Sequence, residues 1–202
     1  MRHIDTYLTS LEKRFGIARP PFPRMNLEIE FAVGDITEMV RIIANAMFPL
    51  GKPRIQVACV RSGGPKNAIA WLQRFDEVVP RYGTKEFEQM RVGIRIRNEL
   101  IDNAPFQTVS FAIAHEFAHL VLFSVGQNEH DEKYVDLLAM YFGFAELYEQ
   151  GKFYGVTPPP QRTGDMLKDV LSMLQGTKRM GVGYLTQDEV VYARKQIVMR
   201  RA

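Results

Sequence analysis

Apolar residues in the first fifty positions recur every three to four residues, which is the spacing of helices that bury one face. The first such stretch covers residues 3–15, and a proline-rich segment at residues 19–23 predicts an extended connector after it. The second stretch begins at Asp35 and Glu38, which stand at the spacing of a helix N-terminal cap, and runs to about residue 47. Two amphipathic helices are therefore expected to open the chain.

Short runs rich in β-branched residues replace the helical spacing after residue 53, which indicates strands. We expect one strand over residues 54–60, a Gly-Gly-Pro turn at residues 63–65 with a second strand, and a third strand over residues 90–97. The polar stretch over residues 73–89 predicts an irregular loop over the sheet.

Helical periodicity returns in the second half of the chain. We expect a long apolar helix from about Pro105 and a second helix over residues 129–150. A proline-rich linker over residues 155–164 precedes a short helix over residues 165–175. A T-x-x-E capping signature at residues 186–189 predicts the start of the last helix.

The resulting order of two helices, three strands and four helices predicts an α+β fold, with a small mixed β-sheet of about three strands packed against helices. With 202 residues, the chain is long enough for one well-packed domain. We expect a single domain over residues 1–202, in which N-terminal helices (1–50) and C-terminal helices (163–202) flank a core over residues 54–150.

Composition indicates an ordinary soluble globular protein, with 46% hydrophobic and 24% charged residues. No uncharged apolar run is long enough to span a membrane, and the first residues predict an amphipathic helix and not a signal segment. The single Cys59 excludes an internal disulfide and is expected to be a small buried side chain in its strand, so we expect a cytoplasmic location. The net charge of +3 gives no argument for nucleic acid, and we do not expect it as a partner.

The most distinctive stretch is His115-Glu116-Phe117-Ala118-His119, an H-E-x-x-H motif inside an apolar run. Burying its polar side chains costs free energy unless each has a partner. Residues four apart share a helix face, so His115 and His119 can direct their imidazoles at one divalent ion. The motif predicts a zinc hydrolase site with Glu116 as the general base. The alternative is a pair of hydrogen-bonded core histidines beside an exposed Glu116.

A catalytic zinc site needs a third protein ligand. Leu122 and Val125 stand where the metzincin pattern requires glycine and histidine, which excludes that continuation. The next helix carries Glu132 and Asp136, which are four apart and share a face. We expect Glu132 to bind the metal and Asp136 to accept the far ring N–H of a ligating histidine, with one zinc ion per chain.

Other third ligands remain open, namely His130, Asp131 and Asp136 near the start of the same helix. The interpretation without a metal is a solvated acidic face, which the helix dipole favours at an N-terminus. A set of two histidines and one carboxylate also accepts Mn or Co.

H-E-x-x-H with E-x-x-V-D on the next helix resembles the gluzincin pattern, in which E-x-x-A-[ND]-x-x-A follows the histidine helix. Thermolysin-like peptidases, membrane-anchored housekeeping peptidases and small soluble ImmA/IrrE-like metallopeptidase domains share this pattern. Val135 replaces the usual alanine, whereas Asp136 and Ala139 match. The resemblance covers about residues 54–148 and implies a zincin-like fold, with the H-E-x-x-H active-site helix followed by a glutamate helix.

The resemblance also implies how a peptide would be held and cut. Asn-Ala-x-Ala ahead of an edge strand is similar to the gluzincin substrate edge, and the strand over residues 90–97 would hold an extended peptide by β-augmentation. Thermolysin-like enzymes stabilise the oxyanion with a downstream His or Tyr, for which Tyr154 and Tyr184 are the candidates here. The residues expected at the substrate edge are Asn67, Ala68, Ile94 and Ile96.

We therefore expect a soluble zinc endopeptidase with a narrow protein substrate, and the resemblance implies a regulatory cut. The alternative is a metal-binding module without proteolytic activity that contacts a protein or nucleic-acid partner, although an intact Glu116 argues against it. A third hypothesis is an interaction protein that uses a basic C-terminal helix. The basic residues of that segment are Arg194, Lys195, Arg200 and Arg201.

Overall fold

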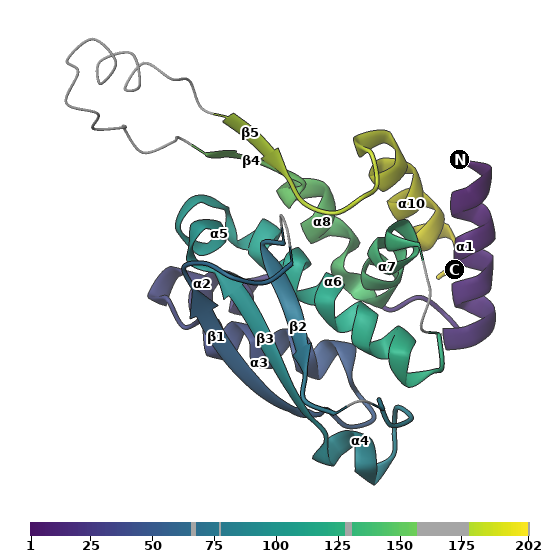
Figure 1. The fold of residues 1–202 in the computed structure, drawn as a ribbon. Helices are drawn as coiled ribbons and strands as arrows, with labels where there is room; N and C mark the ends of the chain where they lie inside the picture. The colour runs from purple at the N-terminus through teal and green to yellow at the C-terminus, as the bar shows by residue number, and fades with distance from the viewer. Residues whose placement is uncertain (66–67, 77, 128–130, 157–177, 202) are drawn as a thin grey trace.

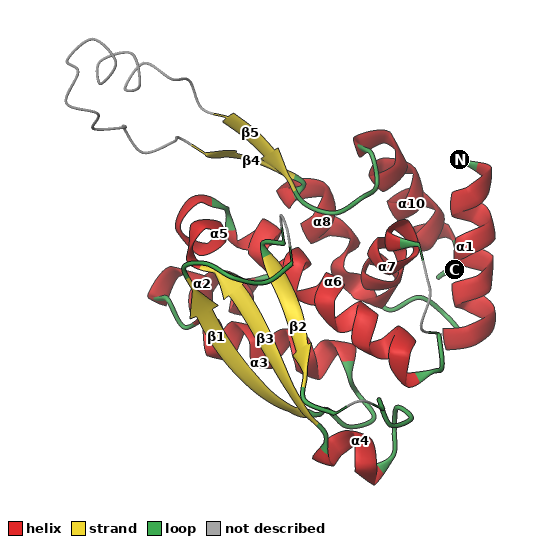
Figure 2. Ribbon diagram, viewed as in Figure 1, coloured by secondary structure: helices red, strands yellow, loops and turns green. Residues whose placement is uncertain are grey.

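A computed structural model describes residues 1–65, 68–76, 78–127, 131–156 and 178–201 of the chain (Figure 1). A three-stranded sheet lies beside a larger group of helices, and a separate two-stranded hairpin projects from the helical side (Figure 2). The expected α+β class with a small mixed sheet is confirmed.

The helices of the described residues are α1 (Arg2–Phe15), α2 (Met25–Val33), α3 (Ile36–Met47), α4 (Lys85–Gln89), α5 (Asn98–Asn103), α6 (Phe106–Ser124), α7 (Glu132–Ala139), the π-helical turn η1 (Met140–Phe144), α8 (Ala145–Gly151) and α10 (Gln187–Met199). The strands are β1 (Arg54–Val60), β2 (Ala70–Arg74), β3 (Arg91–Arg97), β4 (Phe153–Val156) and β5 (Lys178–Gly181).

The three-stranded sheet has the order β1-β3-β2, with β1 parallel and β2 antiparallel to the central β3. Alternation along β3 puts Val92, Ile94 and Ile96 on one face, where all three are fully buried. Figure 2 shows helices behind this face, among them α3, which packs against β1. The other face carries the arginines of β3, and no helix among the described residues lies over it.

Helix α6 runs through the middle of the helical side and packs against α3, α7, α8 and β2 (Figure 1). It has the length and apolar composition of a membrane span, which the sequence reading did not expect of any stretch. However, 78% of that span is buried inside the fold, so the apolar surface of α6 is satisfied by protein. α6 is therefore the central helix of the core.

The second expected long helix is not continuous. α7 ends at Ala139, and after the π-helical turn the chain restarts as α8, so the prediction of one helix over residues 129–150 is wrong. Gly143 causes the break, because it adopts φ 108°, which only glycine adopts readily. A methyl group there would lie 2.6 Å from the carbonyl oxygen of Pro20, and the Phe22 N–H donates to the Gly143 carbonyl at 3.0 Å.

Several short elements were missed because their signals are weak in isolation. α2 lies between the expected connector at residues 19–23 and the second expected helix, and α4 lies in the stretch expected to be an irregular loop. α5 and the β4–β5 hairpin were also not expected. The predicted helix over residues 165–175 lies outside the described residues, as does most of the expected linker over residues 155–164, although Gly155 and Val156 belong to β4.

Cys59 is exposed on the outer strand β1, so the expectation of a buried cysteine is wrong. The strand alternates as expected, but β1 is an edge strand that the helices cover only in part. A sequence pattern fixes the alternation of side chains but not the position of a strand within its sheet.

The N-terminal helix α1 packs against both α7 and the C-terminal helix α10. The expected capping signature of α10 is confirmed, because Thr186 and Glu189 form a reciprocal capping box. The Glu189 carboxylate also accepts hydrogen bonds from Lys133 Nζ at 2.8 Å and lies 2.9 Å from His3 Nε2. One buried carboxylate thus joins α10, α7 and α1.

Replacing Gly143 by Ala is expected to lower the free energy of unfolding by about 3 kcal/mol, because it adds a clash with Pro20 to the strain of a positive φ. Gly34→Ala is the matched control, since Gly34 has φ 78° and ψ 13°, in the left-handed helical region, and nothing within 4 Å of an added Cβ. The control should lose only about 1 kcal/mol. Urea unfolding measures both, and equal losses would contradict the role of the break.

Glu189 gives a pH dependence with a defined sign. Burial raises the pKa of its carboxyl, but Lys133, the Thr186 N–H and His3 outweigh burial and lower it to about 2. Glu189 therefore contributes stability above its usual pKa of 4.5, and this is lost as pH falls from 4.5 through 2. Glu189→Gln should cost about 2 kcal/mol at pH 6, and the gap from wild type should shrink towards pH 2.

Urea unfolding between pH 2 and pH 6 tests this dependence, with Glu86→Gln as a control for the same charge change on the exposed surface of α4. A difference between wild type and Glu189→Gln that stays constant over this range would refute it.

Candidate metal centre

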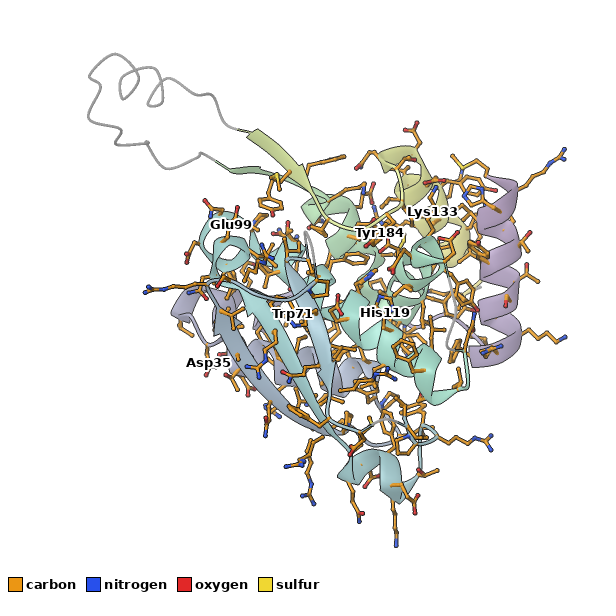
Figure 3. The ribbon with its side chains drawn as sticks, viewed as in Figure 1. Asp35, Trp71, Glu99, His119, Lys133 and Tyr184 are labelled. Atoms are coloured by element: carbon orange, nitrogen blue, oxygen red, sulfur yellow. The ribbon has the colours of Figure 1, made fainter. Side chains whose placement is uncertain are left out.

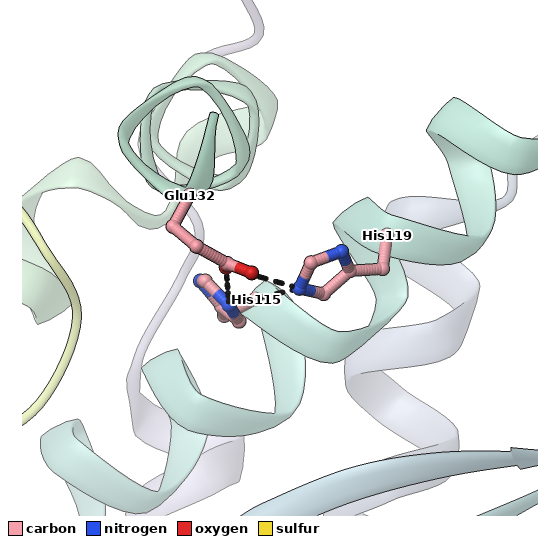
Figure 4. Close-up of side chains that lie close together, drawn as sticks. All are labelled: His115, His119 and Glu132. Carbon is pink, nitrogen blue, oxygen red and sulfur yellow. Dashed lines mark hydrogen bonds and ion pairs between the residues drawn. The ribbon is translucent and has the colours of Figure 1, made fainter. Parts of the chain in front are cut away.

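The sequence places two histidines on one face of the core helix, and the structure brings a carboxylate to them. His115 and His119 are one turn apart on α6, and Glu132 reaches them from the first turn of α7 (Figure 4). α7 begins at this point because the Asp131 side chain caps it by accepting the N–H of Lys133 at 2.7 Å. The three expected metal ligands therefore lie together, drawn from two helices that pack side by side.

Three ligand atoms of this group form a nearly equilateral triangle. The Nε2 atoms of His115 and His119 are 3.2 Å apart, and Glu132 Oε2 lies 3.3 Å from each of them. A tetrahedral metal with bonds of about 2.0–2.1 Å has ligand atoms about 3.3–3.4 Å apart. The spacing and the chemistry of the donor atoms therefore fit a metal ion such as Zn²⁺, with a fourth position left for a non-protein ligand.

Asp136 fixes the orientation of His115. Its Oδ1 lies 2.8 Å from His115 Nδ1, so the ring donates its Nδ1–H there and turns Nε2 towards His119 and Glu132. Asp136 is fully buried, and its Oδ2 accepts hydrogen bonds from the Tyr148 hydroxyl at 2.8 Å and the Leu185 N–H at 3.0 Å. The Tyr184 N–H is a further donor to Oδ2, at 2.5 Å. The expected contact between Asp136 and a ligand histidine is present.

Glu116 follows His115 on α6 and faces the sheet. Its Oε2 accepts a hydrogen bond from the Leu72 N–H at 3.1 Å, so the carboxylate is held by the backbone of β2. Glu116 is not a member of the three-ligand group. The residue expected to act as general base therefore sits between the ligand histidines and a strand edge.

The pKa values of two neighbouring residues of the site are both raised, but for different physical reasons. Burial raises the pKa of Glu116 to about 7, although His115 and the Leu72 N–H act to lower it. Burial lowers the pKa of His115, but hydrogen bonds to Asp136 and Glu132 outweigh it and raise that pKa to about 10. A group of two imidazoles and three carboxylates is thus packed closely enough for each charge to depend on the others.

The expectation that the strand over residues 90–97 is a sheet edge is wrong. β3 is the central strand, paired on both sides, and Ile94 and Ile96 are fully buried on its inner face. The free edge beside Glu116 belongs to β2, whose Leu72 donates its N–H away from the sheet. Asn67 lies outside the described residues, and Ala68 precedes β2 in a turn with its N–H on Pro65. The Asn-Ala-x-Ala motif thus leads into an edge strand, but into β2.

Of the two candidate tyrosines, only one lies near the candidate metal ligands. Tyr184 lies at the site, with its ring 5.8 Å from the His115 ring and its side chain exposed (Figure 3). Tyr154 is buried in β4, paired with Met180 of β5, and makes no hydrogen bond or ring contact with the ligand residues or Glu116. Only Tyr184 remains a candidate for contact with a bound molecule.

The two alternative third ligands that the structure describes make other contacts. Asp131 caps α7 and accepts a hydrogen bond from the Tyr7 hydroxyl at 3.2 Å, and Asp136 faces the Nδ1 side of His115. Neither belongs to the three-ligand group, whereas Glu132 does. His130 lies outside the described residues.

Sequence reasoning missed two residues around Asp136, Tyr148 and Lys152, and one beside Glu116, Leu72. Tyr148 stacks on Phe111 with ring centroids 3.6 Å apart, and its hydroxyl reaches Asp136. Lys152 is buried, which lowers its pKa, and its Nζ lies 3.3 Å from that hydroxyl. Leu72 contributes only a backbone N–H. None of the three belongs to a sequence motif, because each makes its contact only once distant segments have folded together.

A comparison of the chain with protein families, with curated proteins and with solved structures finds no match in any of them.

Asp136→Asn is expected to lower zinc affinity by about 10- to 100-fold, because the amide cannot accept every hydrogen bond that holds His115 and the segment at Tyr184. Competition with a chromophoric chelator measures the affinity, and circular dichroism confirms that the variant is folded. Tyr148→Phe removes one donor without touching His115 and should change zinc affinity by no more than a few-fold. Wild-type affinity in Asp136→Asn would contradict this role.

Proposed function

We propose that the chain is a zinc-dependent endopeptidase, in which His115, His119 and Glu132 hold the metal and Glu116 is the general base. The observation that carries the proposal is the position of Glu116, next to two ligand histidines and hydrogen-bonded to the free edge of β2. A purely structural metal site needs neither an adjacent base nor an adjacent strand edge. The resemblance of the motif pair to gluzincins supports the same class.

An extended peptide segment is the substrate class that the edge of β2 favours. In an antiparallel pair, alternate residues of the edge strand direct their backbone N–H and C=O groups away from the sheet. Leu72 is one such residue, and the alternation adds Ala70 and Arg74 on either side. The Leu72 N–H is taken by Glu116, so a peptide paired by β-augmentation with the outward groups of Ala70 and Arg74 passes beside that carboxylate.

Zinc bound at this site supplies Lewis acidity and makes water a stronger acid at neutral pH. The chain's own residues handle the proton. Glu116 Oε2 is occupied by the Leu72 N–H, so Oε1 is the atom that accepts a proton from the attacking water and returns it to the leaving amine. Asp136 keeps the Nδ1–H of His115 fixed, and Tyr184, whose ring lies 5.8 Å from the His115 ring, would donate a hydrogen bond to a developing oxyanion.

We also propose a cytoplasmic location. α6, the only described helix with the composition of a membrane span, is mostly buried in the fold. The exposed thiol of Cys59, the single cysteine of the chain, suits a reducing compartment.

Glu116→Gln is expected to bind one zinc per chain, as wild type does, and to lose at least about 100-fold in peptide hydrolysis, because the amide cannot accept a proton. Elemental analysis measures the metal, and a library of quenched fluorescent decapeptides measures hydrolysis. Glu86→Gln, which removes the same charge from an exposed position, should retain both. His119→Ala should lose the metal and the activity together.

Two outcomes would overturn the proposal at different levels. Wild type that holds no zinc after refolding with it would remove the metal centre altogether. Wild type that holds zinc but cleaves no peptide at a rate dependent on Glu116 would leave a metal-binding module without proteolytic activity.

A further inference from the structure

The positive charge of this protein is segregated onto its sheet. The strands β1, β2 and β3 contain five arginines and no acidic residue. The whole chain has 26 basic and 23 acidic residues, so removing these five arginines leaves 21 basic against 23 acidic residues. The excess positive charge of the chain therefore lies entirely in the three-stranded sheet.

Four of these arginines share the face that helices leave uncovered. The register aligns Arg54 of β1 with Arg91 of β3, and the period of two puts Arg95 and Arg97 on that side as well. We name Arg54, Arg91, Arg95, Arg97, Trp71 and Phe75 the open-face residues. None of the four arginines forms an ion pair within the part of the chain that the structure describes.

Two aromatic rings lie among the arginines of the open face. Trp71 of β2 is aligned with Arg95 of β3, and its indole packs over Gly64 (Figure 3). Phe75 lies over Gly93, where its ring would be 3.5 Å from an added Cβ, and the Arg91 guanidinium is 5.9 Å from the ring centroid. Phe75 is 41% exposed, so its ring is accessible to a ligand beside Arg91.

Protection against strand pairing does not explain this arrangement. Charged residues serve that purpose on edge strands, which have free backbone groups. Three of the four arginines stand on β3, the central strand, which is paired along both sides. Their charge is therefore available for a ligand and is not needed to block an edge.

We propose that the open face binds single-stranded nucleic acid. Arginines contact the phosphates, and the exposed Phe75 ring and the half-buried Trp71 ring stack with bases, as a sheet surface does when it holds two or three nucleotides. The aromatic rings favour this ligand over an acidic protein segment, which would use the arginines alone. The binding face is distinct from the β2 edge and the metal centre, so the inference does not depend on the proposed peptidase activity.

The full-length chain in EDTA, with a 12-nucleotide oligothymidine as the probe, tests the proposal. Trp71 is the only tryptophan, so its emission reports directly on the open face. We expect the oligonucleotide to quench this emission at 50 mM salt. With about three phosphate contacts, affinity should fall at least tenfold between 50 and 200 mM salt, because each contact on a single strand contributes about 0.7 to the logarithmic salt slope.

Arg91→Gln combined with Arg95→Gln is expected to weaken binding at least tenfold at 50 mM salt and to lower the salt slope by about 1.4. Lys13→Gln combined with Lys195→Gln is the matched control, since it removes the same charge from exposed positions on α1 and α10. The control should bind as wild type does, which also separates the open face from the basic C-terminal helix. Phe75→Ala should weaken binding about fivefold or more without changing the slope.

Three results would overturn the proposal. Oligothymidine that leaves Trp71 emission unchanged at 50 mM salt would show that the face does not bind it. Equal affinities for the arginine pair and the lysine pair would place binding elsewhere. A 12-residue polyglutamate that quenches Trp71 with the same affinity as the oligonucleotide would identify the face as a site for acidic protein segments.

Discussion

The carboxylate of Asp136 is the interaction on which the rest of this site depends. It is fully buried and accepts hydrogen bonds from groups on α6, α8 and the segment that leads into α10. A buried charge is tolerated only when such donors surround it, so the carboxylate and its donors hold each other in place. The direction of the His115 ring is one result of this arrangement, and the attachment of α8 and of the segment before α10 to α7 is another.

One edge, the inner face and the outer face of the three-stranded sheet have different surroundings. One edge, β2, lies beside Glu116 and supplies a backbone donor to the carboxylate, whereas the inner face of β3 is part of the core. The outer face carries arginine and aromatic side chains that no described helix covers, although Gly64 packs against the Trp71 indole. A small sheet thus presents three different surfaces, each with its own chemistry, within a few strands.

The grouping of the three candidate ligands could be predicted from sequence because their geometry is local. His115 and His119 share a face by helical period alone, and Glu132 follows from a short connection between two helices. The substrate edge could not be predicted in the same way, because the order β1-β3-β2 is set by contacts between distant segments. The turn at Gly143 was missed for a related reason, since its conformation is stabilised by the segment at Pro20.

The break at Gly143 has a consequence for how the site can be transplanted. In a straight helix, residues 136 and 148 would be about 18 Å apart along the axis, too far for Tyr148 to reach Asp136. The break in the helix brings the Tyr148 hydroxyl to 2.8 Å from Asp136 Oδ2. The backbone N–H groups of residues 184 and 185 donate to the same oxygen. A helical hairpin cut out at residues 106–139 would contain every metal ligand and still lack the scaffold that orients them. The smallest autonomous unit extends almost to the C-terminus, so this centre is a property of the whole chain and not a portable motif.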